Sequence, residues 1–306
     1  MTEFQDRLID VSRDVDELLS GKHDQEHQAI LDWLSAPDPS TNYQKAVQLC
    51  QADTGIWFLE SEEYAGWKIY PASFLWLHGI PGCGKTVLSS TVIRSVQQHC
   101  ANDPGKVVLY FYFDFNDPQK QGVEFMIRSL IVQLSEQCIE TPSALDALYS
   151  SCGDGRKQPS LEGLLDALQQ EVEELPQCFI ILDALDECTG AGTDTDTGKE
   201  GLLCVLQTMV GWEFENLHLL VTSRRERVIE DILGGFVEEH NIVGLRSEVV
   251  DKDINTYVRQ RLRDDKKLSK WYRDVKMRQE IEATLMEGAR GMYENPFRCS
   301  TIEELT

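Results

Sequence analysis

The chain has 306 residues, enough for about two domains and for a core that folds without a disulfide or metal ion. Its 52 acidic and 29 basic residues give a net charge of −23, which disfavours binding to nucleic acids and to anionic membranes. The nine cysteines lack metal-ligand spacing, and no signal peptide or membrane-spanning run is found, so we expect a reduced, cytoplasmic protein without a membrane partner.

The first 50 residues are predicted to form a helical segment. Apolar side chains recur at helical spacing over 3–19 and over roughly 24–35, before the turn-forming residues 36–42. The following stretch, 42–70, is rich in aromatic side chains. Two interpretations stay open for Trp57, Phe58 and Trp67: packing in the core or a lid, which is favoured, or stacking on a nucleotide base.

From residue 73, short apolar runs alternate with amphipathic stretches, as in an α/β domain. Strands are predicted at 73–77, 107–113, 178–182, 217–221 and 242–245. Helices are predicted at 85–99, 122–138, 160–175 and 199–211, and the polar stretch 189–199 is predicted to be a loop. Because the strands are continuously apolar and are joined through helices, we expect a parallel sheet covered on both faces.

After residue 247 the predicted strands stop. Charged amphipathic helices at 251–264 and 274–289 predict a small helical subdomain over 248–291. Residues 292–306 show no continuing periodicity, so we expect a disordered tail of the kind that a truncated or frame-shifted gene leaves. Between the 1–50 segment and this subdomain, residues 51–247 are predicted to form the main α/β domain.

Residues 79–86 read GIPGCGKT, which matches the phosphate-binding pattern G-x-x-x-x-G-K-[ST] between a predicted strand and a predicted helix. Glycines allow the sharp turn that points backbone N–H groups at phosphates, and the helix adds the positive end of its dipole. Lys85 is predicted to neutralise the β- and γ-phosphates, and Thr86 to supply a hydroxyl to Mg²⁺. A glycine turn that binds nothing is the disfavoured alternative. The predicted nucleotide contacts are Gly79, Ile80, Pro81, Gly82, Cys83, Gly84, Lys85 and Thr86.

An acidic turn follows the apolar strand in CFIILDALDEC, residues 178–188. Asp183 stands at the carboxyl end of that strand, where open α/β sheets place their ligands, and is predicted to hold the shell of Mg²⁺. Either Asp186 or Glu187 is predicted to orient or deprotonate the attacking water, with Glu187 preferred. A turn that is acidic for structural reasons alone is the alternative.

Another apolar strand ends in cationic residues in LHLLVTSRRE, 217–226. Arg224 is predicted to contact the γ-phosphate, and Arg225 is the alternative for this role. A pair of solvated arginines at the start of a loop is the structural interpretation that stays open.

GIPGCGKT, LDALDEC (182–188) and VTSRRE (221–226) together resemble the NACHT branch of the signal-transduction P-loop ATPases, over about 54–290. The segment TGIWFLESEEYAGW, 54–67, is similar to the stretch before the P-loop in fungal NACHT proteins, which is grouped as nephrocystin-3-like. The resemblance implies a RecA-like P-loop NTPase core with strand order 5-1-4-3-2. It also implies that Asp183 organises Mg²⁺, that Asp186 and Glu187 serve hydrolysis, and that Arg224 is the sensor arginine.

In this family the nucleotide works as a switch, since ADP holds a closed monomer and ATP permits self-assembly. The resemblance therefore implies ATP–Mg²⁺ binding, slow hydrolysis and self-association. Family members continue into winged-helix and repeat domains, for which these residues show no pattern, so we expect free exchange of nucleotide. Two other functions stay open: an interaction module that binds nucleotide without switching, and a P-loop enzyme that transfers phosphate to a metabolite.

Overall fold

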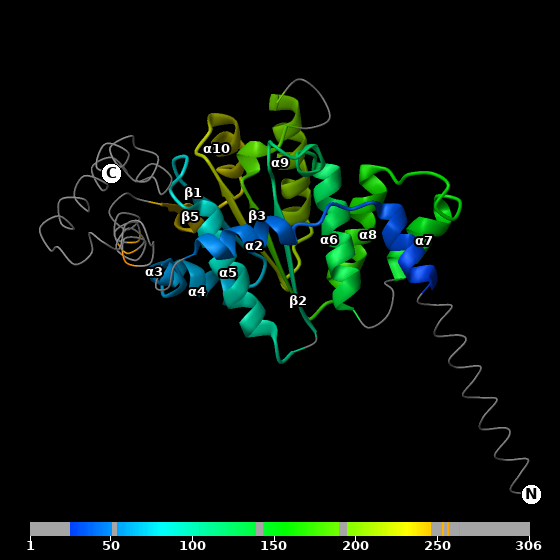
Figure 1. Cartoon of the computed structure of the whole chain (residues 1–306), viewed down its shortest axis with the longest axis horizontal. Coiled ribbons are helices and arrows are strands. Elements are labelled where there is room, and N and C mark those ends of the chain that lie inside the picture. The colour runs from blue at the N-terminus through cyan, green and yellow to red at the C-terminus, as the bar shows by residue number, and fades with distance from the viewer. Residues whose placement is uncertain are drawn as a thin grey trace, which may run out of the picture.

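The computed structural model describes residues 25–50, 54–103, 105–138, 143–189 and 195–245, together with Asp253, Thr256 and Arg263. Its strands are β1 (Ser73–His78), β2 (Lys106–Tyr112), β3 (Gln177–Asp183), β4 (Leu217–Ser223) and β5 (Ile242–Gly244). They form one five-stranded parallel sheet in the order β2–β3–β4–β1–β5 (Figure 1). This confirms the parallel sheet and the strand order that the resemblance implied, in which β4 lies between β1 and β3.

Helices connect and cover these strands. The α-helices are α2 (Ser40–Leu49), α3 (Ile56–Leu59), α4 (Glu62–Ile69), α5 (Lys85–Cys100), α6 (Val123–Gln137), α7 (Ser143–Ser151), α8 (Leu161–Glu173), α9 (Thr195–Gly211) and α10 (Arg227–Leu233). The 3-10 helices are η1 (Pro118–Lys120), η2 (Leu185–Glu187) and η3 (Glu239–Asn241). Residues 25–34 are also helical.

The sheet has a hydrophobic core on each face, and its strands contribute side chains to both, because successive side chains of a strand point to opposite faces. In β1, Phe74 and Trp76 pack in the core formed with α6, α8, α9 and α10. Leu75 and Leu77 pack in the second core, with α3, α4 and α5. In Figure 1 the sheet accordingly lies between α5 on one side and α6 and α8 on the other. The expectation of a sheet covered on both faces is confirmed.

The carboxyl ends of the parallel strands meet at one edge of the sheet. His78, the last residue of β1, pairs with Ser223 of β4 and with Gly244 of β5. On the other side, Asp183 ends β3 opposite Tyr112 of β2. This register brings the turn after β1, the acidic turn after β3 and the arginines after β4 to the same edge.

The part of the N-terminal segment that the structure describes packs on the α/β core. Trp33 and Leu34 are buried in the core of the α6 and α8 face. The Trp33 indole donates to the carbonyl of Lys157, and the Arg128 guanidinium donates to that of Leu34. Figure 1 shows the chain continuing from this helix, beside α7 and α8, across to α2, which lies against α5.

The aromatic stretch adds short helices that the pattern did not predict, α3 and α4. Phe58 and Trp67 are buried in the core with α5, in agreement with the favoured interpretation of packing rather than base stacking. Short α7 and α10 were likewise not predicted. The prediction of a loop over 189–199 is wrong at its end, because α9 begins at Thr195 and buries Leu202 and Leu206 in the core.

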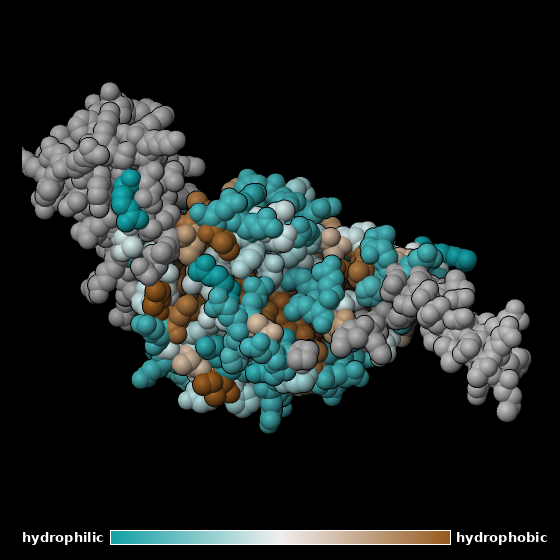
Figure 2. All heavy atoms as spheres, turned by 60° about the horizontal axis from the view of Figure 1, so that its bottom comes forward, coloured by the Kyte–Doolittle hydropathy of each residue, from teal (hydrophilic) through white to brown (hydrophobic). Residues whose placement is uncertain are grey.

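Two further predictions fall almost wholly outside the described residues. Of the helical subdomain over 248–291, only Asp253, Thr256 and Arg263 are described, all in helical conformation, and none of the 292–306 tail is described. None of the helices described for this chain combines the length and apolarity of a membrane-crossing segment. On the face shown in Figure 2, hydrophilic side chains predominate and apolar ones gather in small separate groups.

Candidate functional site

The GIPGCGKT segment forms the turn between β1 and α5, and its glycines are needed for the geometry. Gly82 and Gly84 have φ angles of 72° and 91°, a region that side chains with a Cβ rarely adopt. A Cβ at Gly79 would lie 2.5 Å from Cys83 Sγ. Cys83 itself is buried, and burial raises the pKa of its thiol, so this cysteine packs beneath the loop as a neutral side chain.

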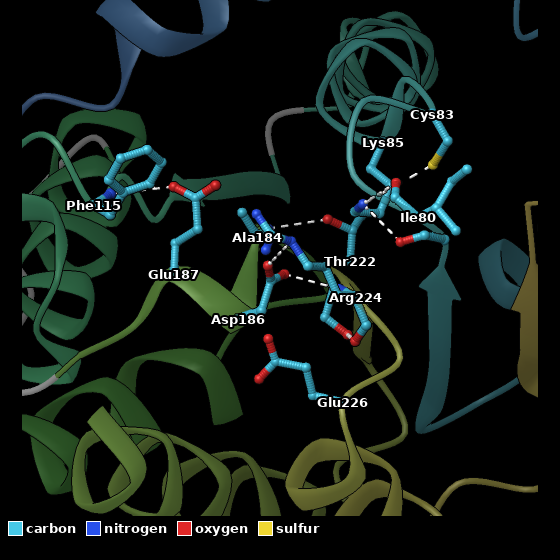
Figure 3. Close-up of polar contacts among 12 residues, drawn as sticks. Ile80, Cys83, Lys85, Phe115, Ala184, Asp186, Glu187, Thr222, Arg224 and Glu226 are labelled. Carbon is cyan, nitrogen blue, oxygen red and sulfur yellow. Dashed lines mark hydrogen bonds and ion pairs between the residues drawn. The ribbon is translucent and has the colours of Figure 1, made fainter. Parts of the chain in front are cut away.

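Helix α5 begins directly after this turn, at Lys85, and no side chain caps its first turn. Its first N–H groups and the positive end of its dipole therefore face the loop, as in anion-binding helix ends. Lys85 Nζ donates to the carbonyls of Gly79 and Ile80, at 2.9 and 3.0 Å (Figure 3). The loop thus places an ammonium group over its own backbone, where it would meet a phosphate group.

Asp183 joins the P-loop helix to the sheet. Its carboxylate is only 2% exposed and accepts from three hydroxyls: Ser89 at 2.6 Å, Thr86 at 2.7 Å and Thr222 at 2.7 Å. Burial raises the pKa of Asp183, and these three hydrogen bonds act in the opposite direction. Thr86 and Asp183 together offer the hydroxyl and carboxylate oxygens that suit Mg²⁺.

Ser89 and Thr222 were not predicted as site residues, although both had a detectable signal in the sequence. Ser89 lies three residues after Thr86, on the same face of α5. Thr222 is a polar residue at the carboxyl end of the otherwise apolar β4. Each becomes part of the site only through the packing of α5 and β4 against Asp183.

The acidic turn after β3 separates the two candidate bases. Ala184 adopts a left-handed conformation, with φ 59°, and its N–H donates to Thr222 Oγ1 at 3.0 Å. In η2, which follows, Asp186 Oδ1 accepts from the Arg224 N–H at 2.8 Å and its Oδ2 lies 2.9 Å from Arg224 Nε (Figure 3). The Asp186 carboxylate is therefore engaged in holding Arg224.

Glu187 points the other way, toward the loop after β2 (Figure 3). Its Oε2 accepts from the backbone N–H of Phe115 at 3.1 Å. Burial and the nearby carboxylates of Asp186, Asp114 and Asp183 raise the pKa of Glu187, and the Phe115 N–H opposes them. A carboxylate with a raised pKa is a suitable proton acceptor near neutral pH. Phe115, after Ser89 and Thr222, is a third contact that the sequence pattern did not reveal.

Both arginines after β4 line an open hollow of about 830 Å³ beside the first residues of the P-loop, together with His78, Gly79, Ile80 and Pro81. Arg225 forms an ion pair with Glu230 at this edge. The Arg224 side chain is 44% exposed and that of its partner Asp186 is 4% exposed, so a buried carboxylate holds a guanidinium that solvent can still reach. Each arginine therefore has an acidic partner and a partly exposed side chain beside the P-loop, and the choice of Arg224 over Arg225 as the anion contact stays a prediction.

Comparison with known proteins places this site in a family. Residues 53–224 match the model of the family "Nephrocystin 3, N-terminal". The chain is 24% identical over 247 residues to the vegetative incompatibility protein HET-E-1 of Podospora anserina, a match that covers 79% of this chain and 17% of that protein.

Solved structures of low similarity were also found. One is Drosophila ORC bound to DNA, with a TM-score of 0.43, 15% identity and coverage of 87% of this chain and 62% of that one. Another is C. elegans PCH-2, with a TM-score of 0.42, 14% identity and coverage of 90% and 65%.

The family match spans more than half of the chain, and it includes the P-loop, the acidic turn and Arg224. The five-stranded parallel sheet has the order expected for a RecA-like core. The chain therefore belongs to the Nephrocystin 3, N-terminal family and is a NACHT-like P-loop NTPase module that binds nucleotide.

Proposed function

We propose that this chain binds ATP with Mg²⁺, hydrolyses it slowly, and uses the bound nucleotide, ATP or ADP, to control self-association. The observation that carries the proposal is the buried Asp183 carboxylate, which accepts from the Thr86 hydroxyl of the P-loop at 2.7 Å. In this proposal residues 51–247 form the nucleotide-binding domain, 1–50 precede it as a helical segment, and 248–291 and 292–306 follow as subdomain and tail.

Phosphate binding falls to the P-loop, residues 79–86. The N–H groups of the turn and of the first turn of α5 face the phosphates, and Lys85 neutralises their charge. Thr86 and Asp183 would hold Mg²⁺, with Asp183 acting through water because three hydroxyls already occupy its oxygens. The ion, when bound, offsets negative charge on the transferred phosphate.

Hydrolysis is assigned to Glu187, whose carboxylate accepts the proton of the attacking water. Asp186 is the less suitable base because both of its oxygens already bind Arg224. Its role is to hold the arginine at the edge of the P-loop. Arg224 then contacts the γ-phosphate when ATP is bound.

In this proposal, the switch comes from competition between a γ-phosphate and Asp186 for the Arg224 guanidinium. A γ-phosphate would draw the guanidinium away from the Asp186 carboxylate, whereas with ADP the ion pair persists, so the two nucleotides favour different positions of this side chain. The relative HET-E-1 is by its name a vegetative incompatibility protein, which is consistent with a signalling role.

Binding is tested by calorimetry with ATP–Mg²⁺. Lys85→Ala should weaken binding at least about tenfold, because a charge-assisted contact is worth about 1.5–3 kcal/mol. Lys45→Ala removes an exposed lysine of α2 and is the matched control. Unchanged affinity in Lys85→Ala would refute the assignment of the P-loop.

Switching is tested by light scattering in ATP and in ADP. We expect a larger particle with ATP and loss of that difference in Arg224→Ala. Equal sizes in the two nucleotides would favour an interaction module without switching. Turnover that requires an added small acceptor would favour a phosphotransferase.

A further inference from the structure

The loop after β2, residues 113–121, forms a hydrogen bond with the side chain of Glu187. Its Phe115 N–H donates to Glu187 Oε2 at 3.1 Å. The carbonyl of the same Phe115 accepts from Gln121 Nε2 at 2.6 Å, and the N–H of Asp114 donates to the carbonyl of Lys120 at 3.1 Å. These two hydrogen bonds close the loop on itself and fix Phe115 relative to Lys120 and Gln121.

Helix α2 is fastened to this loop from the other side. Lys120 is 5% exposed, and its Nζ donates to Asn42 Oδ1 at 2.5 Å and to Thr41 Oγ1 at 3.0 Å. Asn42 Nδ2 in turn donates to Asp114 Oδ2 at 3.2 Å. A buried ammonium group is costly without such partners, so the first turn of α2 and the loop hold each other in place.

The charges around Glu187 show why the position of this N–H matters. Three carboxylates surround it, Asp114 in the loop, Asp183 at the end of β3 and Asp186 in η2, and each raises its pKa, as burial does. The Phe115 N–H is the contact that lowers the pKa. Displacement of the loop would therefore both misdirect the carboxylate and favour its protonated form, which cannot accept a proton from water.

We propose that Asn42 and Lys120 are positioning residues for Glu187, which set the place of the Phe115 N–H by fastening α2 to the 113–121 loop. The inference rests on the proposed role of Glu187 in hydrolysis and adds its regulation. Since α2 is the end of the N-terminal segment, a shift of that segment would change the rate of hydrolysis without any contact with the nucleotide.

The test compares Asn42→Ala and Lys120→Met with Tyr43→Phe in the full chain. Tyr43→Phe is the matched control, because it removes a hydroxyl of the same helix that faces Gln97 of α5 rather than the loop. We expect kcat for ATP hydrolysis to fall about tenfold to a hundredfold in the first two variants, since small displacements of catalytic groups have effects of this size. KM and the ATP affinity should stay unchanged, and the acid limb of the kcat–pH profile should move to higher pH.

A second pair of variants acts on the hydrogen bond itself. Phe115→Pro removes the N–H, whereas Phe115→Ala keeps it and removes only the side chain. The proline variant should reproduce the shift of the acid limb and the alanine variant should not. If Lys120→Met or Phe115→Pro fails to fold, Asn42→Ala decides, because it leaves Lys120 bound to Thr41 and close to Asp117.

Two results would overturn the inference: parent kcat and pH profile in Asn42→Ala, or a lower kcat with an unmoved acid limb, which would mean a structural role only. Glu187→Gln is measured alongside. If it leaves turnover intact, the assignment of the base is wrong and the proposed function fails at that point. If it abolishes turnover while Asn42→Ala has no effect, only the positioning inference fails.

Discussion

Replacement of Thr222 by valine isolates one polar contact at the end of β4. Thr222 is fully buried, donates to Asp183 Oδ1 at 2.7 Å and accepts from the Ala184 N–H at 3.0 Å. Thr222→Val keeps the shape of the side chain but removes both hydrogen bonds. The buried Ala184 N–H then has no partner, at a cost of about 1–3 kcal/mol, and loss of a bond to a carboxylate adds about 1.5–3 kcal/mol. We expect the free energy of unfolding to fall by about 2.5–6 kcal/mol.

Ser89→Ala is the matched control, because it removes one hydroxyl from Asp183 and leaves no N–H unpaired. It should cost about 1.5–3 kcal/mol, so the two variants should differ by roughly the penalty of one buried, unpaired N–H group, about 1–3 kcal/mol. Urea-induced unfolding, followed by tryptophan fluorescence and circular dichroism, measures both. A Thr222→Val effect equal to or smaller than that of Ser89→Ala would refute this account of the turn.

Three further predictions concern the same edge and the opposite end of the sheet. Glu187→Gln should lower ATP turnover, measured by phosphate release, about a hundredfold or more while ATP binding stays normal. If Asp186→Asn abolishes turnover and Glu187→Gln does not, Asp186 is the base and the choice of Glu187 is wrong. Ala184→Val should destabilise by about 2 kcal/mol or more, because a β-branched residue is strained at a φ of 59°, while Ala184→Gly should stay within about 1 kcal/mol of the parent in the same urea assay. Burial lowers the pKa of His218 from its ordinary 6.5, so as the pH falls the unfolded chain takes up this proton before the folded chain does. The free energy of unfolding should therefore decrease as the pH drops below about 6.5. His218→Gln should make this decrease smaller, which unfolding curves at several pH values measure.

The parallel sheet was predictable because its signal is local. Continuous apolar runs such as 178–182 can be buried on both faces only inside a parallel sheet with helical crossovers, and the five strands observed differ from the predicted ones by at most two residues at either end. The P-loop was predictable for the same reason, since its glycines and its lysine lie within eight consecutive residues, 79–86. The short helices α3, α7 and α10 were not predicted, because only tertiary packing stabilises helices of this length.

Within the site, the sequence determined which residue types stand at the carboxyl ends of β1, β3 and β4, and it left Asp186 and Glu187 as alternatives. The tertiary structure separated the two by their partners. Asp186 meets Arg224, which lies 38 residues away in sequence, and Glu187 meets the Phe115 N–H, 72 residues away. Hydrogen bonds of this kind form between loops that become neighbours through the strand order β2–β3–β4. The hydrophobic periodicity of a single segment does not contain information on the order of strands in the sheet, so these contacts could not be predicted from it.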